Sequence, residues 1–312
     1  FCSSKNFLFT KYIIVSFQVT ETFIMLKIAI FSGLISLAFS SSCTEGDWTI
    51  AYNPSQCDYE GGKFTITCPS KSDAGSCGDR MQSNNGLGAG YYTANIQSAP
   101  GSGTDTSLYL YTYGRNNNQD QPWNEIDIEI LGPQVGGGQS KIWTNLWTGF
   151  KVQHGQYVTL PYDISQSGHD CAIQIAGTSS NRTIYWLFDG SVSRWMYYGN
   201  FGDVVSTVDN KQFQANIVLW GSADDSWSDM GQLSWNSNNF PIYAYFQNVQ
   251  LSTGVHPDPD TFAVGVDKPD WEEIAKYPNE IHGSNLDQMM SINKDYFKKA
   301  RNDKVPRLIH NE

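Results

Sequence analysis

Charge of either sign is scarce in this sequence, and positive charge is the scarcer. Only 16% of the 312 residues are Asp, Glu, Lys or Arg, and 31 acidic against 20 basic residues give a net charge of −11. No basic cluster offsets that excess, which argues against nucleic acid or an anionic membrane surface as a partner. The net negative charge would neither favour nor oppose the binding of an uncharged partner.

Long apolar runs are also nearly absent. The clearest, Ile28–Phe39, is shorter than the ~20 residues that a membrane-spanning helix needs. It follows Met25 and a lysine and ends in serines, which is the pattern of a secretory signal peptide, with a signal anchor as the competing interpretation. We therefore expect residues 1–24 to be upstream sequence, residues 25–42 to be a signal peptide, and the mature protein to be secreted, extracellular and free of the membrane.

Internal repeats and low-complexity segments are missing, which weighs against a structural wall or matrix protein. Aromatic residues reach 14% and glycines number 28, a composition typical of extracellular all-β proteins. Short β-like runs separated by Gly, Asn, Ser and Pro turns fill residues 43–255 and predict one sandwich of two antiparallel sheets. Residues 256–312 are charged, and Ser284 could cap a helix there. We expect a partly helical extension that packs on the domain, recruits a partner or is partly disordered.

Cysteine is sparse as well, and Cys2 lies in the expected leader. The other five are Cys43, Cys57, Cys68, Cys77 and Cys171. In an oxidising compartment we expect disulfides near the mature N-terminus, with the pairing left open and one thiol unpaired. A zinc site is the weaker alternative, because neither the spacing nor nearby histidines fit one. The sequence Asn-Arg-Thr makes Asn181 a predicted glycosylation site.

The most informative segment is residues 123–132, W-N-E-I-D-I-E-I-L-G. Strict alternation places Glu125, Asp127 and Glu129 on one face of a strand and isoleucines on the other. Glu and Asp are poor strand formers, and neighbouring like charges raise at least one pKa, so that one carboxyl stays protonated while another is ionised. That pair of states supplies an acid and a nucleophile, as a retaining glycosidase requires. The alternative is an amphipathic strand with a solvated acidic face.

Several other runs pair an apolar face with a face of aromatic and amide side chains. The ranges are 107–113, 141–147, 184–188, 216–220 and 242–251. Sugar rings stack on Trp and Tyr, and amides bind hydroxyl groups. Ordinary core or rim packing is the alternative for any single aromatic. The side chains that we expect to bind substrate are Trp123, Asn145, Trp147, Tyr111, Asn216, Trp220 and Trp227.

The acidic segment resembles the active-site strand of glycoside hydrolase family 16, whose signature is Glu, aliphatic, Asp, aliphatic, an optional residue, then Glu. The resemblance implies that Glu125 is the nucleophile, that Asp127 orients and tunes it, and that Glu129 is the acid/base. The optional residue is absent here, which points to the branch of lichenases, xyloglucan endotransglycosylases and fungal chitin–glucan transglycosylases.

The resemblance extends more loosely over most of residues 47–251. Thr144–Trp147, Tyr185–Gly190 and Leu219–Trp227 are similar to a Thr-Asn-aliphatic-aromatic piece, a Trp-Tyr-Val-Asp-Gly hairpin and a Leu-Trp-Asn-Ala-Asp-Asp-Trp block of the family. The resemblance implies an all-β jelly-roll with an open cleft across a concave sheet.

This sequence departs from the family pattern at several positions. Lichenases usually have Asp where Asn124 stands and Asn where Val218 stands, although Asn216 lies on the same strand face. Gln247 stands where calcium-binding members often have Asp, so no metal or cofactor is expected. We expect His154 and His169 to be structural.

Together these features predict a monomeric, secreted, endo-acting retaining glycosidase. Its expected partner is a polysaccharide, a mixed-linkage β-1,3-1,4-glucan or a related β-glucan. One alternative is a transglycosylase that remodels wall glucan, xyloglucan or chitin. Another is a carbohydrate-binding jelly-roll without activity, but such a protein needs no paired glutamates.

Overall fold

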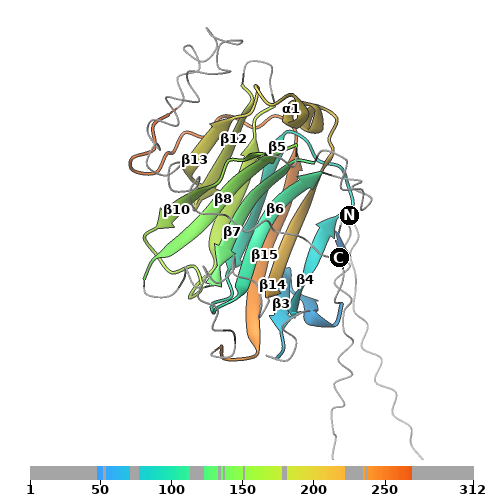
Figure 1. Cartoon of the computed structure of the whole chain (residues 1–312), viewed down its shortest axis with the longest axis vertical. Helices are drawn as coiled ribbons and strands as arrows, with labels where there is room; N and C mark the ends of the chain where they lie inside the picture. Colours follow the sequence, from blue (N-terminus) through green and yellow to red (C-terminus); the bar gives the residue numbers. More distant parts are fainter. Residues whose placement is uncertain are drawn as a thin grey trace, which may run out of the picture. The chain divides into compact units, whose positions relative to one another are not determined.

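The computed structural model describes residues 48–51, 54–70, 77–112, 123–132, 135, 138–149, 152–177, 181–221, 235 and 238–268. These residues form two antiparallel sheets that pack on one another around a single large apolar core (Figure 1). The fold predicted from the sequence, an all-β jelly-roll-like sandwich, is confirmed.

Sheet A has the strand order β1-β4-β14-β6-β7-β8-β10, and β9 pairs with β8. Its strands are β1 (Trp48–Ile50), β4 (Cys77–Ser83), β6 (Thr104–Thr112), β7 (Glu125–Leu131), β8 (Ser140–Thr148), β9 (Val152–Gln153), β10 (Gln156–Leu160) and β14 (Phe213–Gly221).

Sheet B has the strand order β13-β12-β11-β5-β15-β3-β2. Its strands are β2 (Cys57–Glu60), β3 (Lys63–Cys68), β5 (Gly90–Gln97), β11 (His169–Ile175), β12 (Thr183–Phe188), β13 (Ser191–Tyr197) and β15 (Ile242–Thr253). A short 3-10 helix, η1 (Pro54–Gln56), precedes β2, and the helix α1 (Gly202–Asp209) joins β13 to β14.

The runs that alternate in the sequence become strands β6, β8, β12, β14 and β15. The apolar faces of these strands form the core between the two sheets, and the residues on them lose nearly all contact with solvent. The predicted hairpin after β12 is also present. Its turn residues Asp189 and Gly190 have φ values of 47° and 76°, and glycine adopts this left-handed conformation at little cost. Helix α1 is an element that the sequence analysis did not predict.

The start of the C-terminal extension packs against sheet B. The Val192 amide donates to the Thr261 carbonyl at 2.9 Å, and the Ala263 amide donates back to Val192 at 2.8 Å. Phe262 and Val266 cover a small apolar cluster on the outer side of β11 to β13. For residues 256–268, packing on the domain is therefore the alternative that the structure supports. The helix predicted after Ser284 lies outside the described residues, as does the signal peptide.

The cysteines agree with the expectation of disulfides close to the mature N-terminus. A disulfide joins Cys68 to Cys77, and Cys57 is also disulfide-bonded. Cys171 is the unpaired thiol among the described cysteines, and it is fully buried. The described part of the chain contains no helix long and apolar enough to cross a membrane.

Candidate active site

Strand β7 carries the three acids between β6 and β8, well inside sheet A. Ile126 and Ile128 have no exposed surface and belong to the core, so Glu125, Asp127 and Glu129 lie on the opposite face of the sheet. The two glutamates are half-buried and remain accessible. The acids thus share one face, as the alternation predicts, while their chemical roles remain predictions.

The middle acid differs from its neighbours because it is buried. Asp127 is only 1% exposed, and the Asn145 amide donates to its Oδ2 at 3.0 Å. The pKa of Asp127 is raised well above its usual value, first by burial, then by the charges of Glu125 and Glu129 and by a hydrogen bond to Glu125. The hydrogen bond from Asn145 acts in the opposite direction and lowers this pKa. Asp127 is therefore favoured as a neutral carboxyl that can donate a hydrogen bond to Glu125.

Polar side chains continue across the sheet on both sides of Asp127. Asn145 of β8 and Tyr109 of β6 lie directly opposite it, and Asn216 of β14 lies opposite Tyr109. Both amides are almost fully buried. Arg80 of β4 donates to the Tyr109 hydroxyl at 3.3 Å. The predicted residues Asn145 and Asn216 thus lie on the acid face, and the structure adds Tyr109 and Arg80, which the sequence analysis did not single out.

Aromatic side chains cluster at the Glu125 end of the acid row. Tyr111 and Trp147 lie opposite Glu125 on the two neighbouring strands. Trp123 packs between them, with ring centroids 5.8 Å from Tyr111 and 5.9 Å from Trp147. Trp123 is 4% exposed, whereas the other two are half-buried, so they offer the more accessible ring surface.

A second aromatic pair lies at the Glu129 end. Trp143, opposite Glu129, packs edge-on against Tyr157 of β10 at 4.8 Å, and neither was among the predicted site residues. Trp220 is farther away on β14, opposite Asp105, whose Oδ2 accepts a hydrogen bond from its indole at 3.1 Å. The predicted residue Trp227 lies outside the described residues.

Directly beneath the acids, two buried residues connect the sheets. Trp186 of β12 donates its indole N–H to the backbone carbonyl of Asp127 at 2.9 Å. The guanidinium carbon of Arg194 lies 4.4 Å from the centre of the Trp186 ring. Arg194 also donates to the hydroxyl of Thr144 at 2.9 Å and to the backbone oxygens of Thr144 and His154. Sheet B therefore supports the backbone of the middle acid from behind.

Asn124, where the family pattern has Asp, organises the start of β7. Its Nδ2 donates to the Thr207 hydroxyl of α1 at 2.8 Å, and its Oδ1 accepts from the Gly149 amide at 2.9 Å. Its backbone exchanges hydrogen bonds with Thr112. An aspartate could accept from Gly149 but could not donate to Thr207 when ionised, so the amide suits this position. Asn124 therefore anchors the residue before Glu125.

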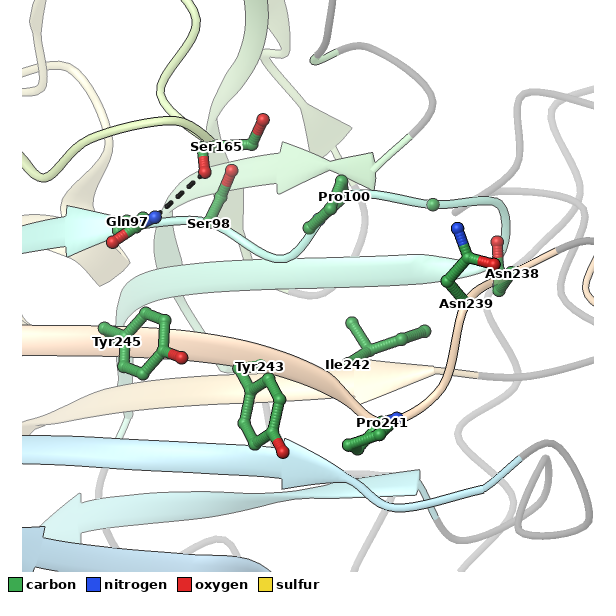
Figure 2. A pocket seen from close by; sticks show the side chains of 11 residues that line it. Gln97, Ser98, Pro100, Ser165, Asn238, Asn239, Pro241, Ile242, Tyr243 and Tyr245 are labelled. Carbon is green, nitrogen blue, oxygen red and sulfur yellow. Dashed lines mark hydrogen bonds between the residues drawn. The ribbon is translucent and has the colours of Figure 1, made fainter.

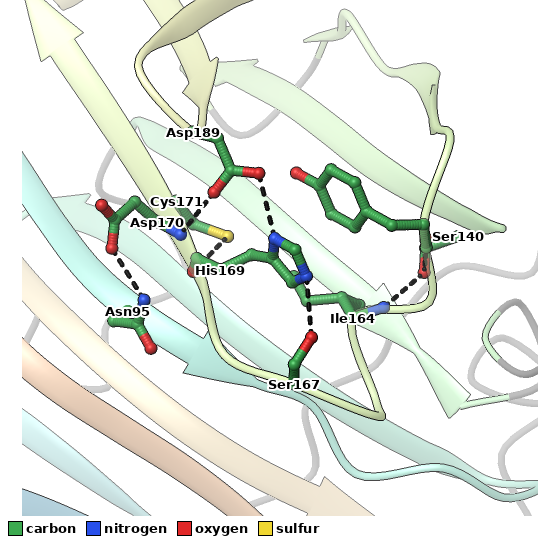
Figure 3. A network of polar contacts seen from close by, with 9 residues as sticks. Asn95, Ser140, Ile164, Ser167, His169, Asp170, Cys171 and Asp189 are labelled. Atoms are coloured by element: carbon green, nitrogen blue, oxygen red, sulfur yellow. Dashed lines mark hydrogen bonds and ion pairs between the residues drawn. The ribbon is translucent and has the colours of Figure 1, made fainter. Parts of the chain in front are cut away.

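The two histidines have structural surroundings, as expected. His154 is largely buried beside Phe201, and burial together with the charge of Arg194 lowers its pKa to about 4. His169 lies between Asp189 and Ser167, with 3.0 Å contacts to both, and stacks on Tyr162 at 3.7 Å (Figure 3). These contacts hold the β12–β13 turn against β11.

The predicted glycosylation site Asn181 is half-buried, and its Nδ2, the atom that a glycan would modify, donates to Asp258. Glycosylation remains a prediction, and it would require that contact to open. Within the described ranges, no group of three or more His, Cys, Asp or Glu is placed to hold a metal ion.

Comparison with known proteins gives a consistent result. The family described as glycosyl hydrolases family 16 matches residues 44–237, more than half of the chain. A beta-glucanase of Paenibacillus polymyxa is 27% identical over 192 residues, which cover 61% of this chain and 70% of that protein.

A beta-glucanase of Fibrobacter succinogenes is 26% identical over 162 residues, covering 52% of this chain. The match spans only 42% of that relative's own length. Among solved structures, the beta-glucanase of Bacillus licheniformis superposes with a TM-score of 0.51 at 20% identity, covering 69% of this chain and 96% of that one. This last similarity concerns the fold alone.

Proposed function

Since this chain belongs to family 16 of the glycosyl hydrolases, we propose that it cleaves internal β-glucosidic bonds of a β-glucan with retention of anomeric configuration. The observation that carries the proposal is the arrangement on β7, where two accessible glutamates flank a buried aspartate on one face of the sheet. Retaining glycosidases need two carboxyl groups in opposite protonation states, and we propose that Glu125 is the ionised one and Glu129 the protonated one.

In the proposed reaction, Glu125 attacks the anomeric carbon while Glu129 protonates the departing glycosidic oxygen. Water then resolves the glycosyl-enzyme, with Glu129 acting as the base. The buried Asp127 favours its neutral form, and its proton can be donated to Glu125. That hydrogen bond favours the ionised form of Glu125 and orients it for attack. We infer that this donation, more than any charge on Asp127, tunes the nucleophile.

The surrounding side chains support a neutral sugar chain as the substrate. Tyr111 and Trp147 flank Glu125, and Trp143 lies opposite Glu129, so aromatic rings are available at both ends of the acid row. The half-buried Arg80–Tyr109 pair provides accessible hydrogen-bonding groups between those ends, and the amides Asn145 and Asn216 are buried beside it. The relatives carry the name beta-glucanase, which supports a β-glucan, and we propose the mixed-linkage β-1,3-1,4 polymer first.

We also propose that the protein acts outside the cell. The Cys68–Cys77 disulfide supports an oxidising compartment, and the Met25–Ser42 pattern supports secretion through a signal peptide. N-terminal sequencing of secreted protein should begin within a few residues of Ser41–Cys43. A mature chain that still carries Ile28–Phe39 would contradict secretion by this route.

The test of the reaction is proton NMR of the first product from an activated β-glucan donor. Retention predicts that the β-anomer appears before mutarotation, and direct release of the α-anomer would overturn the proposal. Azide should rescue Glu125→Ala with an inverted product and Glu129→Ala with a retained one, because only the second variant keeps its nucleophile.

Product sizing separates hydrolysis from transfer. Incubation with mixed-linkage glucan, xyloglucan, laminarin and chitin oligomers should give only shorter products if water is the acceptor. Products longer than the donor would identify the transglycosylase alternative, in which a second sugar chain resolves the same intermediate. Binding of these polymers without any cleavage would identify the third alternative, a binding protein.

A further inference from the structure

The outer face of sheet B, on the side opposite the acids, carries a row of accessible side chains along β15. Tyr243, Tyr245 and Gln247 alternate with buried residues, and Tyr243 is 39% exposed. The two tyrosine rings are nearly parallel, with centroids 6.1 Å apart and planes inclined by 13°. These two parallel rings form an apolar strip at the surface of the sheet.

Two cavities adjoin this strip. One of about 410 Å³ is lined by residues that include Gln97, Asn238, Pro241, Tyr243 and Tyr245. In Figure 2, Tyr245 and Tyr243 follow one another along β15 and Pro241 lies just before the strand. Gln97, at the end of the neighbouring strand β5, and Ser98 and Pro100 after it lie beside them.

The second cavity, of about 290 Å³, is lined by Lys63, Asn95, Gln97, Gly168, Tyr245 and Gln247. It shares Gln97 and Tyr245 with the first, so the two together form one elongated site along β15.

The polar groups of this site are held in place by neighbouring backbone. Gln97 donates to the Ser165 carbonyl at 3.0 Å. Asn238 exchanges hydrogen bonds with the backbone of Ser102, at 2.9 Å and 2.7 Å. A Cβ on Gly101 would lie 2.6 Å from the Asn238 oxygen, so glycine is needed for this close approach. The site is therefore largely preformed, which reduces the entropy lost on binding.

The charge of the site indicates a neutral ligand. Among the described residues, no carboxylate lines either cavity, although the whole chain carries a net charge of −11. Among the described lining residues the one cation is Lys63, whose ammonium lies over the Tyr245 ring, 4.7 Å from its centre, and is attracted by the ring electrons. Flat aromatic surface bordered by amides matches the apolar faces and hydroxyl groups of a sugar chain.

We propose that this site along β15 is a second, non-catalytic binding site for a β-glucan chain. The inference rests on the proposed function for the identity of the polymer, but its geometry is independent of the acids. Because it faces away from β7, a chain bound there leaves the acid face open. It would hold the protein on an insoluble polysaccharide while other chains reach the glutamates.

The test compares Tyr243→Ala/Tyr245→Ala with wild type in three assays. These are sedimentation with insoluble β-glucan, turnover of the same insoluble glucan, and turnover of a short activated oligosaccharide. Sedimentation affinity should fall about tenfold, the usual scale for loss of exposed aromatic anchors, and insoluble turnover should fall with it. Oligosaccharide turnover should stay unchanged, which also shows that the variant is folded.

Two control variants sharpen the comparison. Tyr243→Phe keeps the ring and should keep the affinity, because stacking does not need the hydroxyl group. Gln250→Ala changes an exposed side chain on the same strand that lines neither cavity, and it should behave like wild type.

Equal sedimentation and equal insoluble turnover for wild type and the double alanine variant would overturn the inference while leaving the proposed function intact. If instead no β-glucan is cleaved but the double variant still sediments less, the proposed function fails and the binding site stands. Reduced binding to a protein partner with unchanged binding to every polysaccharide would also overturn the inference.

Discussion

The outer faces of the two sheets are built from similar residues but differ in where charge is placed. Both present aromatic rings and amides on a rigid sheet, and both rest on the same apolar core. Sheet A adds the three carboxyl groups of β7, one of them only 1% exposed, and that of Asp105 farther along the face. On sheet B, none of the described residues that line the cavities beside Tyr243 and Tyr245 is a carboxylate.

We propose that this difference separates a catalytic face from a binding face. Aromatic rings and amides suffice to hold a neutral sugar chain, and both faces have them. Breaking a glycosidic bond requires an acid and a nucleophile whose protonation states differ, which costs free energy when like charges are brought together. Among the described residues, the acid row of sheet A is where such groups meet, and Trp186 and Arg194 support it from behind.

The largest effect should come from the accessible glutamates. Glu125→Ala and Glu129→Ala should each lower kcat by a factor of about 10²–10⁴ or more, because each removes a chemical group and no core packing. Steady-state kinetics on mixed-linkage glucan, with circular dichroism to check the fold, measures the effect. Near-normal kcat in either variant would remove that glutamate from the mechanism.

The indole that bridges the sheets should come next. Trp186→Phe removes the donor to the Asp127 carbonyl and should lower the free energy of unfolding by roughly 1–3 kcal/mol, with a fall in kcat. Trp195→Phe is the matched control, since it also loses an indole bond to a backbone carbonyl, that of Asp267, but near the surface of sheet B. For Trp195→Phe, urea denaturation should show a smaller loss in the free energy of unfolding than for Trp186→Phe, and steady-state kinetics should show an unchanged kcat. Equal losses in the two variants would contradict a special role for Trp186.

Asp127→Asn should separate stability from activity. The raised pKa means that the native state keeps a proton which the unfolded chain has already lost, so the wild type loses stability as pH rises above the ordinary aspartate range. Asparagine cannot ionise, and at pH 7 we expect a higher Tm, by about 2–4 °C for each kcal/mol gained. The fall in kcat should be smaller than for either glutamate variant, because the amide still donates to Glu125. A lower Tm at pH 7 would contradict the direction of the shift.

The smallest effect concerns the buried histidine behind sheet A. The pKa of His154 is lowered from 6.5 to about 4, so between these values the unfolded state binds a proton that the native state does not. The wild type should therefore lose stability as pH falls through that range. His154→Gln should flatten the fall of Tm between pH 6.5 and pH 4. An unchanged pH profile would show that His154 is accessible to protonation in the native state.

Much of the architecture could be predicted because it depends on local alternation. The ranges around Leu108, Trp143, Tyr185, Ile217 and Phe246 became strands. Strand β12, around Tyr185, differs from the expected pattern because both of its faces are buried and Trp186 lies in the core. Helix α1 was missed, since its eight residues include three valines and a threonine and carry a weak helical signal. The cavities along β15 were also missed, because they form between segments that are far apart in the sequence.

The sequence by itself determined which residues share the acid face, since a strand sends every second side chain to the same side whatever surrounds it. The tertiary structure decided what lies around and behind that face. Trp186 is 59 residues from Asp127, and Thr207 is 83 residues from Asn124. No local pattern encodes such contacts, because they depend on how the sheets and α1 pack. The same packing buries Asp127 and raises its pKa, so this acid favours its neutral form beside the accessible Glu125 and Glu129.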